Sequence, residues 1–380
     1  MRIPLSSPDV TDQEIEAVAT VLRTPNLSLG PKVEEFEQAI SRYVGASDVV
    51  AVNSGTSALH LCIRALGISE GDEVLVPSFT FIAVANAVRY ERATPVFVDI
   101  DPETLNLDPS LLEAAITSRT RAIIVVHTFG VPADLSQIIE IANRRNLHVI
   151  EDACEAIGAE YDGRKVGAIG DIGVFGFYPN KQITTGEGGA IVSNNPKLAG
   201  KVRELRNQGR RESDEWFQHY ELGYNYRISD INCALGIEQL KRIDEILDRR
   251  ESIASKYNQL LSCDPHLRVP RLVLPQRKIS WFVYVVLLSS RFSRTHRDWI
   301  VREMKLRRIA VGRYFAPIHL QPTYEGSDGE RTLLTSTESC ASRSLALPFF
   351  NRIQESEITE VCLSLRELLR CEQYPPSQAI

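Results

Sequence analysis

The stretch GDIGVFGFYPNKQITTGEGGAIVSN, residues 170–194, places a single lysine, Lys181, between two apolar runs. Residues 174–178 and 188–192 are predicted to be buried strands, so the side chain of Lys181 would lie beside a low-dielectric interior. Burial favours the neutral amine, which is the form that attacks a carbonyl to make a Schiff base. A lysine at a strand end can also extend outward to water, and this stretch alone leaves both interpretations open.

A second stretch, HVIEDACEAIGA at residues 148–159, places acids directly after an apolar strand. Open α/β sheets bind their ligands at the carboxyl ends of their strands, where Glu151 and Asp152 would lie. An aspartate there commonly caps the next turn. Together with a buried lysine further along the chain, Asp152 instead suggests the acid that keeps the pyridine nitrogen of pyridoxal phosphate protonated.

A third stretch, VNSGTSAL at residues 52–59, predicts a strand, a turn and the start of a helix. The main-chain N–H groups of that helix start would form an anion site, with Gly55 allowing close approach and with hydroxyls from Thr56 and Ser57. The same residues also make an ordinary helix cap. A phosphate site is favoured only because the other two stretches occur in the same chain.

The order of predicted elements indicates an α/β fold with a mostly parallel central sheet and helices on both faces. Apolar strands alternate with helical patterns up to about residue 240; the strands are expected at 73–76, 95–98, 122–126 and 147–150, and the helices at 31–43, 78–90 and 135–145. A single helix over 228–261 is expected to lead from a large cofactor-binding domain, residues 1–245, to a small C-terminal α+β domain, residues 246–380. The small domain is expected to contain a strand at 281–288 and helices at 295–305 and 355–371. Residues 208–223 are predicted to form a polar loop.

Composition excludes several classes of protein. The net charge is -6, and basic residues are interspersed with acidic ones, so no nucleic-acid partner is predicted. No apolar stretch reaches the ~18 residues of a membrane span, and the N-terminal residues lack a targeting pattern, so a cytoplasmic protein without membrane contact is expected. Seven cysteines without C-x-x-C spacing suit reduced thiols, and Cys154 is interpreted as a small core residue rather than a nucleophile.

These stretches, with several others in a fixed order, resemble the DegT/DnrJ/EryC1/StrS family of nucleotide-sugar aminotransferases, which have the aspartate-aminotransferase fold, type I, of pyridoxal phosphate enzymes. The others are GDEVLVPSFTFIAVANAV at 71–88, PVFVDID at 95–101, GYNYRISDINCALGIEQL at 223–240, PIHLQP at 317–322 and LALPFF at 345–350. The resemblance covers nearly the whole chain. It implies pyridoxal 5'-phosphate as cofactor, L-glutamate as amino donor, a nucleotide-linked keto sugar as acceptor, a homodimer with shared active sites, and a role in making amino sugars for surface polysaccharides or glycosides.

The resemblance also implies roles for individual residues. Lys181 would bind the cofactor covalently and carry a proton, and Asp152 would pair with the pyridine nitrogen. Glu155 would lie near the ring hydroxyl and Phe81 against the ring face. Gly55, together with Thr56, would hold the phosphate.

Two further implications concern the neighbouring subunit and one departure from the family pattern. Asn225, with Arg227 beside it, would reach the phosphate of the neighbour's cofactor. Many family members have a serine five residues before the lysine, where this chain has Gly176, so Ser57, Asn225 or a main-chain N–H is expected to compensate. His319 is interpreted either as a contact to the sugar or as a core histidine bonded to the protein itself. No metal site is predicted.

Three alternative functions fit the sequence less well. Sugar dehydratases of the same family replace the lysine by histidine, and Lys181 is intact here. The glycines of GAIGDIG, residues 167–173, faintly resemble a dinucleotide loop but do not follow an opening strand. A non-catalytic regulator would need neither Lys181 nor Asp152. Within the family, TGEGG at residues 185–189 is more typical of amination at C4 than at C3, which favours a 4-keto-6-deoxyhexose.

Overall fold

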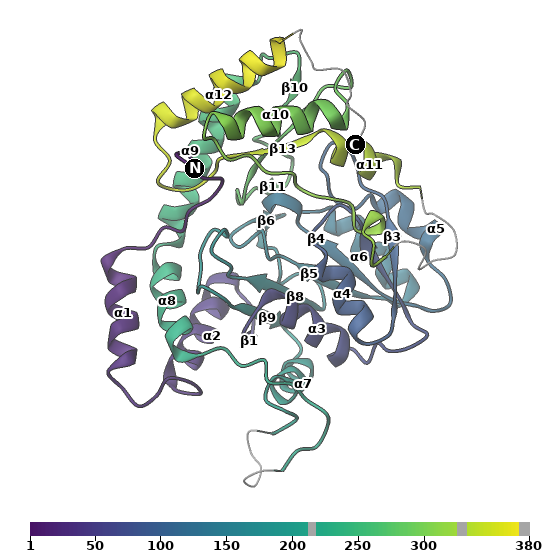
Figure 1. Cartoon of the computed structure of the whole chain (residues 1–380). Coiled ribbons are helices and arrows are strands. Elements are labelled where there is room, and N and C mark those ends of the chain that lie inside the picture. Colours follow the sequence, from purple (N-terminus) through teal and green to yellow (C-terminus); the bar gives the residue numbers. More distant parts are fainter. Residues whose placement is uncertain (212–217, 325–332, 372–380) are drawn as a thin grey trace.

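The computed structural model describes residues 1–211, 218–324 and 333–371, and its centre is a seven-stranded sheet (Figure 1). The strand order is β1-β9-β8-β5-β4-β2-β3. The strands are β1 (Asp48–Val52), β2 (Glu73–Pro77), β3 (Thr94–Val98), β4 (Thr120–Val126), β5 (His148–Asp152), β8 (Ile172–Gly176) and β9 (Gly189–Ser193). Neighbours are parallel except for β9, which runs antiparallel to both β1 and β8. The predicted mostly parallel sheet is confirmed.

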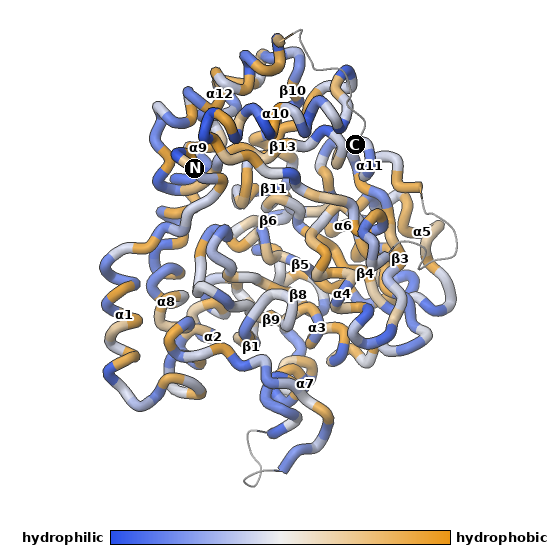
Figure 2. Tube along the Cα trace, in the orientation of Figure 1, coloured by the Kyte–Doolittle hydropathy of each residue, from blue (hydrophilic) through white to orange (hydrophobic). Residues whose placement is uncertain are grey.

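Side chains alternate between the two faces of this sheet, and helices cover each face. Along β4, Ile123 and Val125 belong to one buried core, and Ala122 and Ile124 to the other. The first core contains residues of α2 (Pro31–Val44), α5 (Leu112–Ala115), α6 (Leu135–Arg145) and α8 (Asp230–Lys241). The second contains residues of α3 (Gly55–Ala65), α4 (Ala83–Tyr90) and α7 (Pro196–Arg206). Figure 2 shows hydrophobic residues concentrated along the central strands.

The helix expected over 78–90 begins only at Ala83, so that expectation is wrong in its first turn. Residues before it are held in a turn by a distant segment, because Ile318 donates its N–H to the carbonyl of Ser78 over 3.0 Å. His319 donates its N–H to the Ser78 hydroxyl over 3.1 Å. This turn leaves Phe81 61% exposed at the carboxyl edge of the sheet.

The smaller α+β unit is built on the antiparallel sheet β10-β12-β13. Its elements are α9 (Ile243–Leu261), β10 (Leu267–Arg268), β12 (Tyr284–Leu288), α10 (Arg294–Leu306), α11 (Thr335–Arg343), β13 (Ser344–Leu347) and α12 (Glu355–Arg370). One buried cluster joins α9, α10 and α12 to β12 and β13, and it also contains Ile3. The remaining elements are a short sheet of β6 (Glu160–Tyr161), β7 (Arg164–Lys165) and β11 (Arg277–Lys278), the helix α1 (Asp12–Leu22), and the one-turn helices η1 (Pro109–Leu111), η2 (Thr128–Gly130) and η3 (Ile318–Leu320).

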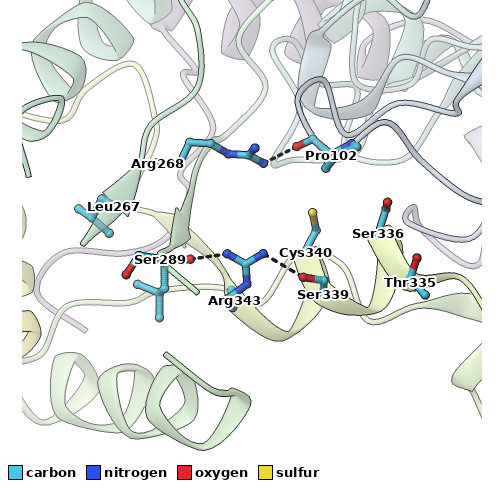
Figure 3. A pocket seen from close by; sticks show the side chains of 10 residues that line it. Pro102, Leu267, Arg268, Ser289, Thr335, Ser336, Ser339, Cys340 and Arg343 are labelled. Atoms are coloured by element: carbon cyan, nitrogen blue, oxygen red, sulfur yellow. Dashed lines mark hydrogen bonds between the residues drawn. The ribbon is translucent and has the colours of Figure 1, made fainter. Parts of the chain in front are cut away.

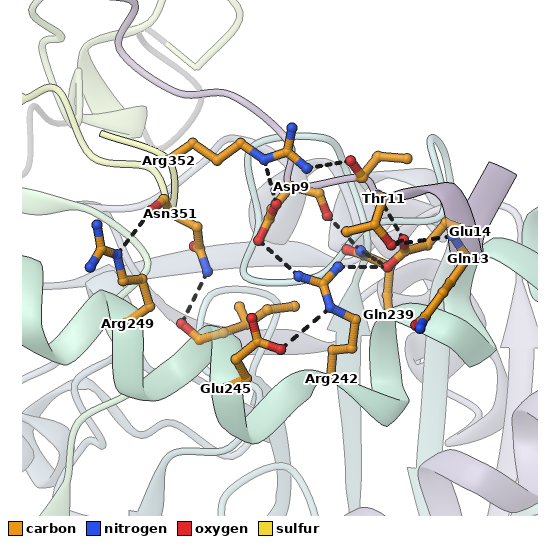
Figure 4. A network of polar contacts seen from close by, with 12 residues as sticks. Asp9, Thr11, Gln13, Glu14, Gln239, Arg242, Glu245, Arg249, Asn351 and Arg352 are labelled. Atoms are coloured by element: carbon orange, nitrogen blue, oxygen red, sulfur yellow. Dashed lines mark hydrogen bonds and ion pairs between the residues drawn. The ribbon is translucent and has the colours of Figure 1, made fainter. Parts of the chain in front are cut away.

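The single helix expected over 228–261 is interrupted at Arg242, which separates α8 from α9. The side chain of Arg242 turns toward the N-terminal segment and pairs with Glu14 over 2.9 Å and with Asp9 over 3.2 Å (Figure 4). These distant acids cannot be anticipated from local periodicity. The α8–α9 corner therefore depends on tertiary ion pairs.

Within the described residues, no helix has the length and apolar composition needed to cross a membrane. Of the loop expected at 208–223, residues 212–217 lie outside the described part of the chain. The seven cysteines are all described and all free.

Candidate active site

A cavity of about 480 Å³ lies where β5 and β8 end, at the carboxyl edge of the parallel strands. It collects residues from the start of α3, the turn after β2, the segments after β5 and β8, and the smaller domain. Its lining comprises Ser54, Gly55, Thr56, Leu59, Thr80, Phe81, Ala83, Val126, Asp152, Cys154, Glu155, Gly176, Phe177, Tyr178, Asn180, Lys181, Glu187, Gly188, Phe282, Tyr314 and Phe315. Six of the residues predicted from the sequence meet here: Gly55, Thr56, Phe81, Asp152, Glu155 and Lys181.

Lys181 lies on the connection between β8 and β9, and its amine points into this cavity. Its Nζ is 3.5 Å from Oε1 of Glu155 and 4.1 Å from the centre of the Phe282 ring. The side chain is 15% exposed, so the amine is largely withdrawn from water without being sealed off. The outward-pointing lysine considered in the sequence analysis is not what the structure shows.

Asp152 is the last residue of β5, and its carboxylate is held at the floor of the cavity. Its Oδ1 accepts the N–H of Cys154 over 3.0 Å, and its carbonyl accepts the N–H of His127 over 3.1 Å. The side chain of Glu155 accepts the N–H of Phe129 over 2.9 Å. Burial raises the pKa of Glu155, and the nearby Lys181 amine and the Phe129 N–H oppose that rise only in part.

The helix α3 begins at the cavity wall with Ser54 as its N-cap. Ser54 Oγ accepts the N–H of Ser57 over 3.0 Å, and the two hydroxyls are 2.9 Å apart. Ser54 lines the cavity, whereas Ser57 is not among its lining residues. The cap was therefore predicted at the right helix, and Ser54 was missed although it directly precedes the glycine.

Cys154 fills the space beside Gly176, the position of the missing family serine. A Cβ built on Gly176 would lie 3.1 Å from the Cys154 sulfur, and one on Gly55 would lie 2.9 Å from it. The thiol thus lies between the start of α3 and the end of β8, where it packs against the core and also lines the cavity. Burial raises the pKa of this thiol well above its usual value, so it keeps its proton and is a poor nucleophile.

Three aromatic residues that the smaller domain contributes to the lining were not identified from the sequence: Phe282, Tyr314 and Phe315. Phe282 lies shortly before β12, and Tyr314 and Phe315 lie between α10 and the PIHLQP stretch. Phe315 stacks on Phe129 with ring centres 5.3 Å apart. Apolar residues in a predicted small domain carry no signal that distinguishes a cavity wall from a core.

Asn225 and Arg227 are not among the described residues that line this chain's own cavity. The flanking side chains turn inward, where Tyr224 donates to Glu91 over 3.0 Å and Tyr226 lies 3.1 Å from the His60 ring nitrogen. Asn225 is exposed, and Arg227 donates to the side chain of Asn207 over 3.0 Å. The segment therefore presents Asn225 to the outside of the chain.

His319 also lies outside the cavity lining. Its Nδ1 is 2.6 Å from the hydroxyl of Ser78, and its Nε2 is 3.4 Å from Oε1 of Glu338. Both ring nitrogens thus have protein partners. These contacts favour the second of the two interpretations, a histidine that joins η3 to the turn after β2.

A second cavity, of about 550 Å³, lies between Pro102, β10 and α11 (Figure 3). Arg268 donates to the carbonyl of Pro102. Arg343 donates to the carbonyl of Leu288 over 2.8 Å and to the hydroxyl of Ser339 over 2.9 Å. The described residues that line this cavity include no lysine and no acid. None of the residues predicted for the active site is in this second lining.

The residues of the first cavity fit pyridoxal phosphate. An amine at Lys181 and a carboxylate at Asp152 face one space, Phe81 offers an aromatic surface, and the start of α3 offers main-chain N–H groups and hydroxyls for a phosphate. When bound, this cofactor supplies a ring that withdraws electrons from the α-carbon of an amino acid. Among the described residues, no group of His, Cys, Asp or Glu is arranged to hold a metal ion.

Comparison with known proteins agrees with this chemistry. The model of the DegT/DnrJ/EryC1/StrS aminotransferase family matches residues 8–366. A GDP-perosamine synthase of Caulobacter vibrioides is 42% identical over 371 residues, covering 97% of this chain and 98% of the relative. The spore coat polysaccharide biosynthesis protein SpsC of Bacillus subtilis is 36% identical, with 97% of each covered.

Solved structures give the same result. DesV of S. venezuelae is 35% identical with a TM-score of 0.90, covering 98% of this chain and 99% of that one. Helicobacter pylori PseC, an aminotransferase involved in the biosynthesis of pseudoaminic acid, is 27% identical with a TM-score of 0.92, covering 97% and 99%. The chain belongs to the DegT/DnrJ/EryC1/StrS aminotransferase family and is a pyridoxal phosphate-dependent sugar aminotransferase.

Proposed function

We propose that this enzyme transfers the amino group of L-glutamate to a nucleotide-linked 4-keto-6-deoxyhexose. The observation that carries the proposal is the placement of Lys181 and Asp152 on one cavity that also contains Phe81 and the start of α3. The TGEGG stretch favours amination at C4. The name of the 42% identical relative, GDP-perosamine synthase, supports a GDP-linked sugar as the first acceptor to test.

In this proposal the amine of Lys181 would hold the cofactor and would serve as the base that moves a proton from the α-carbon of the amino acid. Asp152 would keep the ring nitrogen protonated, and Glu155 would lie near the ring hydroxyl. A positioned base of this kind typically contributes ~10²–10⁴-fold to the rate. The aromatic side chains of Phe282 and Phe315 exclude water from the space around Lys181.

The proposed assembly is a homodimer in which each chain completes the other's site. Support comes from Asn225, which is exposed and does not line the cavity of its own chain. The free thiols suit a cytoplasmic enzyme, which is the location we propose.

The test is a panel of nucleotide-linked keto sugars incubated with holoenzyme and glutamate, with products identified by mass. GDP-linked and dTDP-linked 4-keto-6-deoxyhexoses are compared with 3-keto isomers. Gain of an amino group on a 4-keto acceptor supports the proposal. Turnover confined to 3-keto sugars, or loss of water without nitrogen transfer, contradicts it.

The tether is tested separately by borohydride reduction of the holoenzyme and peptide mapping. We expect the reduced cofactor on Lys181, because it is the lysine in the cavity lining. Reduction at any other lysine contradicts the assignment.

A further inference from the structure

A buried pair of titratable side chains, His127 and Glu151, lies directly behind the cavity and has no place in the proposed chemistry. Both side chains are 0% exposed, and Nε2 of His127 is 3.0 Å from Oε2 of Glu151. Neither residue lines the cavity. A buried carboxylate is costly unless it is well solvated by the protein, so its presence needs an explanation.

Glu151 is solvated almost entirely by main-chain donors. It accepts N–H groups from Gly167 at 2.7 Å, Ile169 at 2.7 Å and Gly170 at 2.6 Å. Burial raises the pKa of this carboxyl, but the His127 and main-chain hydrogen bonds outweigh it and leave the pKa below the ordinary value. The glycines noted earlier as faintly similar to a dinucleotide loop are thus a cradle for a carboxylate of the protein itself.

The partners of His127 assign its tautomer. Nδ1 accepts the N–H of Ala133 over 3.1 Å, so the ring proton is on Nε2 and is donated to Glu151. The imidazole therefore spans Glu151 on one side and the end of the 127–133 segment on the other. The two hydrogen bonds of the His127 ring, to Glu151 and to Ala133, fix the main chain at the carboxyl end of β4.

The turn that begins at His127 holds both acids of the cavity through its main-chain N–H groups. The N–H of His127 donates to the carbonyl of Asp152, and the N–H of Phe129 donates to the carboxylate of Glu155 over 2.9 Å. Phe129 has a φ of 59°, in the left-handed region that is unfavourable for a residue with a side chain. Such a turn persists only where neighbouring contacts enforce it.

We propose that His127 and Glu151 are positioning residues for Asp152 and Glu155: their contact enforces the 127–130 turn, whose N–H groups hold the two acids against the cofactor. The inference rests on the proposed function, in which these acids face the cofactor ring. It gives Glu151, the first acid of the pair that ends β5, a role in positioning Asp152, the second.

Two matched variants separate the contacts of His127. In His127→Gln the amide nitrogen reaches as far as Nε2 and keeps the donation to Glu151; in His127→Asn the amide oxygen keeps the contact to Ala133 but does not reach Glu151. We expect His127→Gln to bind pyridoxal phosphate within about twofold of the parent. We expect His127→Asn to bind about tenfold more weakly and to slow the glutamate half-reaction further, since a buried acceptor loses its donor.

Binding is measured by absorbance titration of the apoenzyme, and the half-reaction by stopped flow at saturating cofactor. Tyr257→Phe is the control, because it removes a buried 2.7 Å hydrogen bond to the Pro348 carbonyl in the smaller domain. It should lower the melting temperature and leave binding and half-reaction unchanged. His127→Asn behaving like this control, or His127→Gln being equally impaired, overturns the inference.

Hydrogen exchange of the parental apoenzyme tests the same idea without a variant. The amides of His127 and Phe129 are expected to exchange far more slowly than exposed amides, and exchange at solvent rates overturns the inference. Failure of the parental protein to bind pyridoxal phosphate counts instead against the proposed function.

Discussion

Lys181 is held by neighbours that its own sequence context does not reveal. The amine rests over the ring of Phe282 and near Glu155, one residue from the smaller domain and one from the larger. An ammonium over an aromatic face is stabilised by ~0.5–2 kcal/mol. The free amine is therefore oriented toward the cavity before any cofactor arrives.

Asp152→Asn is expected to retain the cofactor and lose transamination, because an amide cannot balance a protonated ring nitrogen. The lost charge-assisted hydrogen bond, ~1.5–3 kcal/mol, sets a lower limit of about tenfold on the decrease in rate. Stopped-flow absorbance with glutamate measures it. Parental rates in a variant that binds the cofactor would show that the acid has another role.

Gly176→Ser is expected to lower the free energy of unfolding, although a serine is common at this position in the family. Its Cβ would lie 3.1 Å from the Cys154 sulfur, and overpacking of this kind costs ~1–3 kcal/mol. Urea unfolding of the apoenzyme measures the loss.

Adding Cys154→Ala to Gly176→Ser should restore stability, because the smaller side chain frees the space that the serine needs. The matched control is Cys154→Ala alone. Destabilisations that simply add in the double variant would mean that the two positions do not compete for space.

Much of the site was predictable because its chemistry is local in sequence. Gly55, Phe81 and Lys181 each follow a strand, Asp152 ends one, and parallel strands bring their carboxyl ends together. Phe282 and Tyr314 could not be predicted, since apolar side chains look alike in a wall and in a core. The contacts of His319 depend on a pairing of segments 241 residues apart.

At the scale of elements, the corner between α8 and α9 is organised by one buried acid, Glu14. It accepts hydrogen bonds from Gln239 at 2.8 Å and Arg242 at 2.9 Å, and from the Thr11 N–H at 2.7 Å (Figure 4). Gln239 in turn accepts the N–H of Thr184 over 3.2 Å, on the connection that carries Lys181. The N-terminal segment is therefore linked through Gln239, by two hydrogen bonds, to Thr184, which lies three residues after the lysine.

Glu14 makes stability depend on pH in the acid range. Burial raises its pKa, but the hydrogen bonds from Thr11, Gln239 and Arg242 outweigh burial and lower the pKa to about 2. Because the folded pKa lies below the unfolded one, this stabilisation is complete above about pH 4.5 and is lost as the pH falls toward 2. We expect the contribution of Glu14 to the free energy of unfolding to fall by about 2 kcal/mol between pH 6 and pH 3.

The measurement compares urea unfolding of the parental protein and Glu14→Gln across that range. The parent should be the more stable at pH 6, and the gap should narrow as the pH falls. A constant gap would mean that the carboxylate does not titrate with folding.

The same corner shows where sequence reasoning about elements stops. Apolar spacing through Leu240, Ile243 and Ile246 correctly predicts helix on both sides of residue 242. At the interruption, Arg242 donates to acids more than two hundred residues earlier, and local spacing does not report such contacts. Likewise α4 starts late because a segment near residue 318 occupies the preceding turn.

At the scale of the whole molecule, the proposed dimer predicts complementation between inactive chains. Lys181→Ala and Asn225→Ala are each expected to be inactive or nearly so. Mixed under exchange conditions, they should recover activity, because one site of the mixed dimer receives both intact residues. Glutamate half-reaction rates before and after mixing give the recovery.

The control is the mixture of Lys181→Ala with Asp152→Asn, two residues that line the same cavity of one chain. This mixture also has its two defects on separate chains, but neither site of the mixed dimer is intact. Its activity shows how much recovery comes from subunit exchange without a complete site. A protein that light scattering shows to be a monomer and that is fully active would contradict shared sites.

The domain boundary near residue 245 also stays a prediction. Limited proteolysis would check it.

The position of Ile3 has a consequence for how the protein is made. Residues 2 and 3 donate their N–H groups to the carbonyl of Arg308, and Ala310 donates to Ile3, so the segment that a ribosome releases early is among the last to find its place. Until the intervening three hundred residues have been synthesised, Arg308, Ile309 and Ala310 are not there to pair with this segment. On stalled ribosomes, a protease should cut near residue 3 until residue 310 has cleared the exit tunnel.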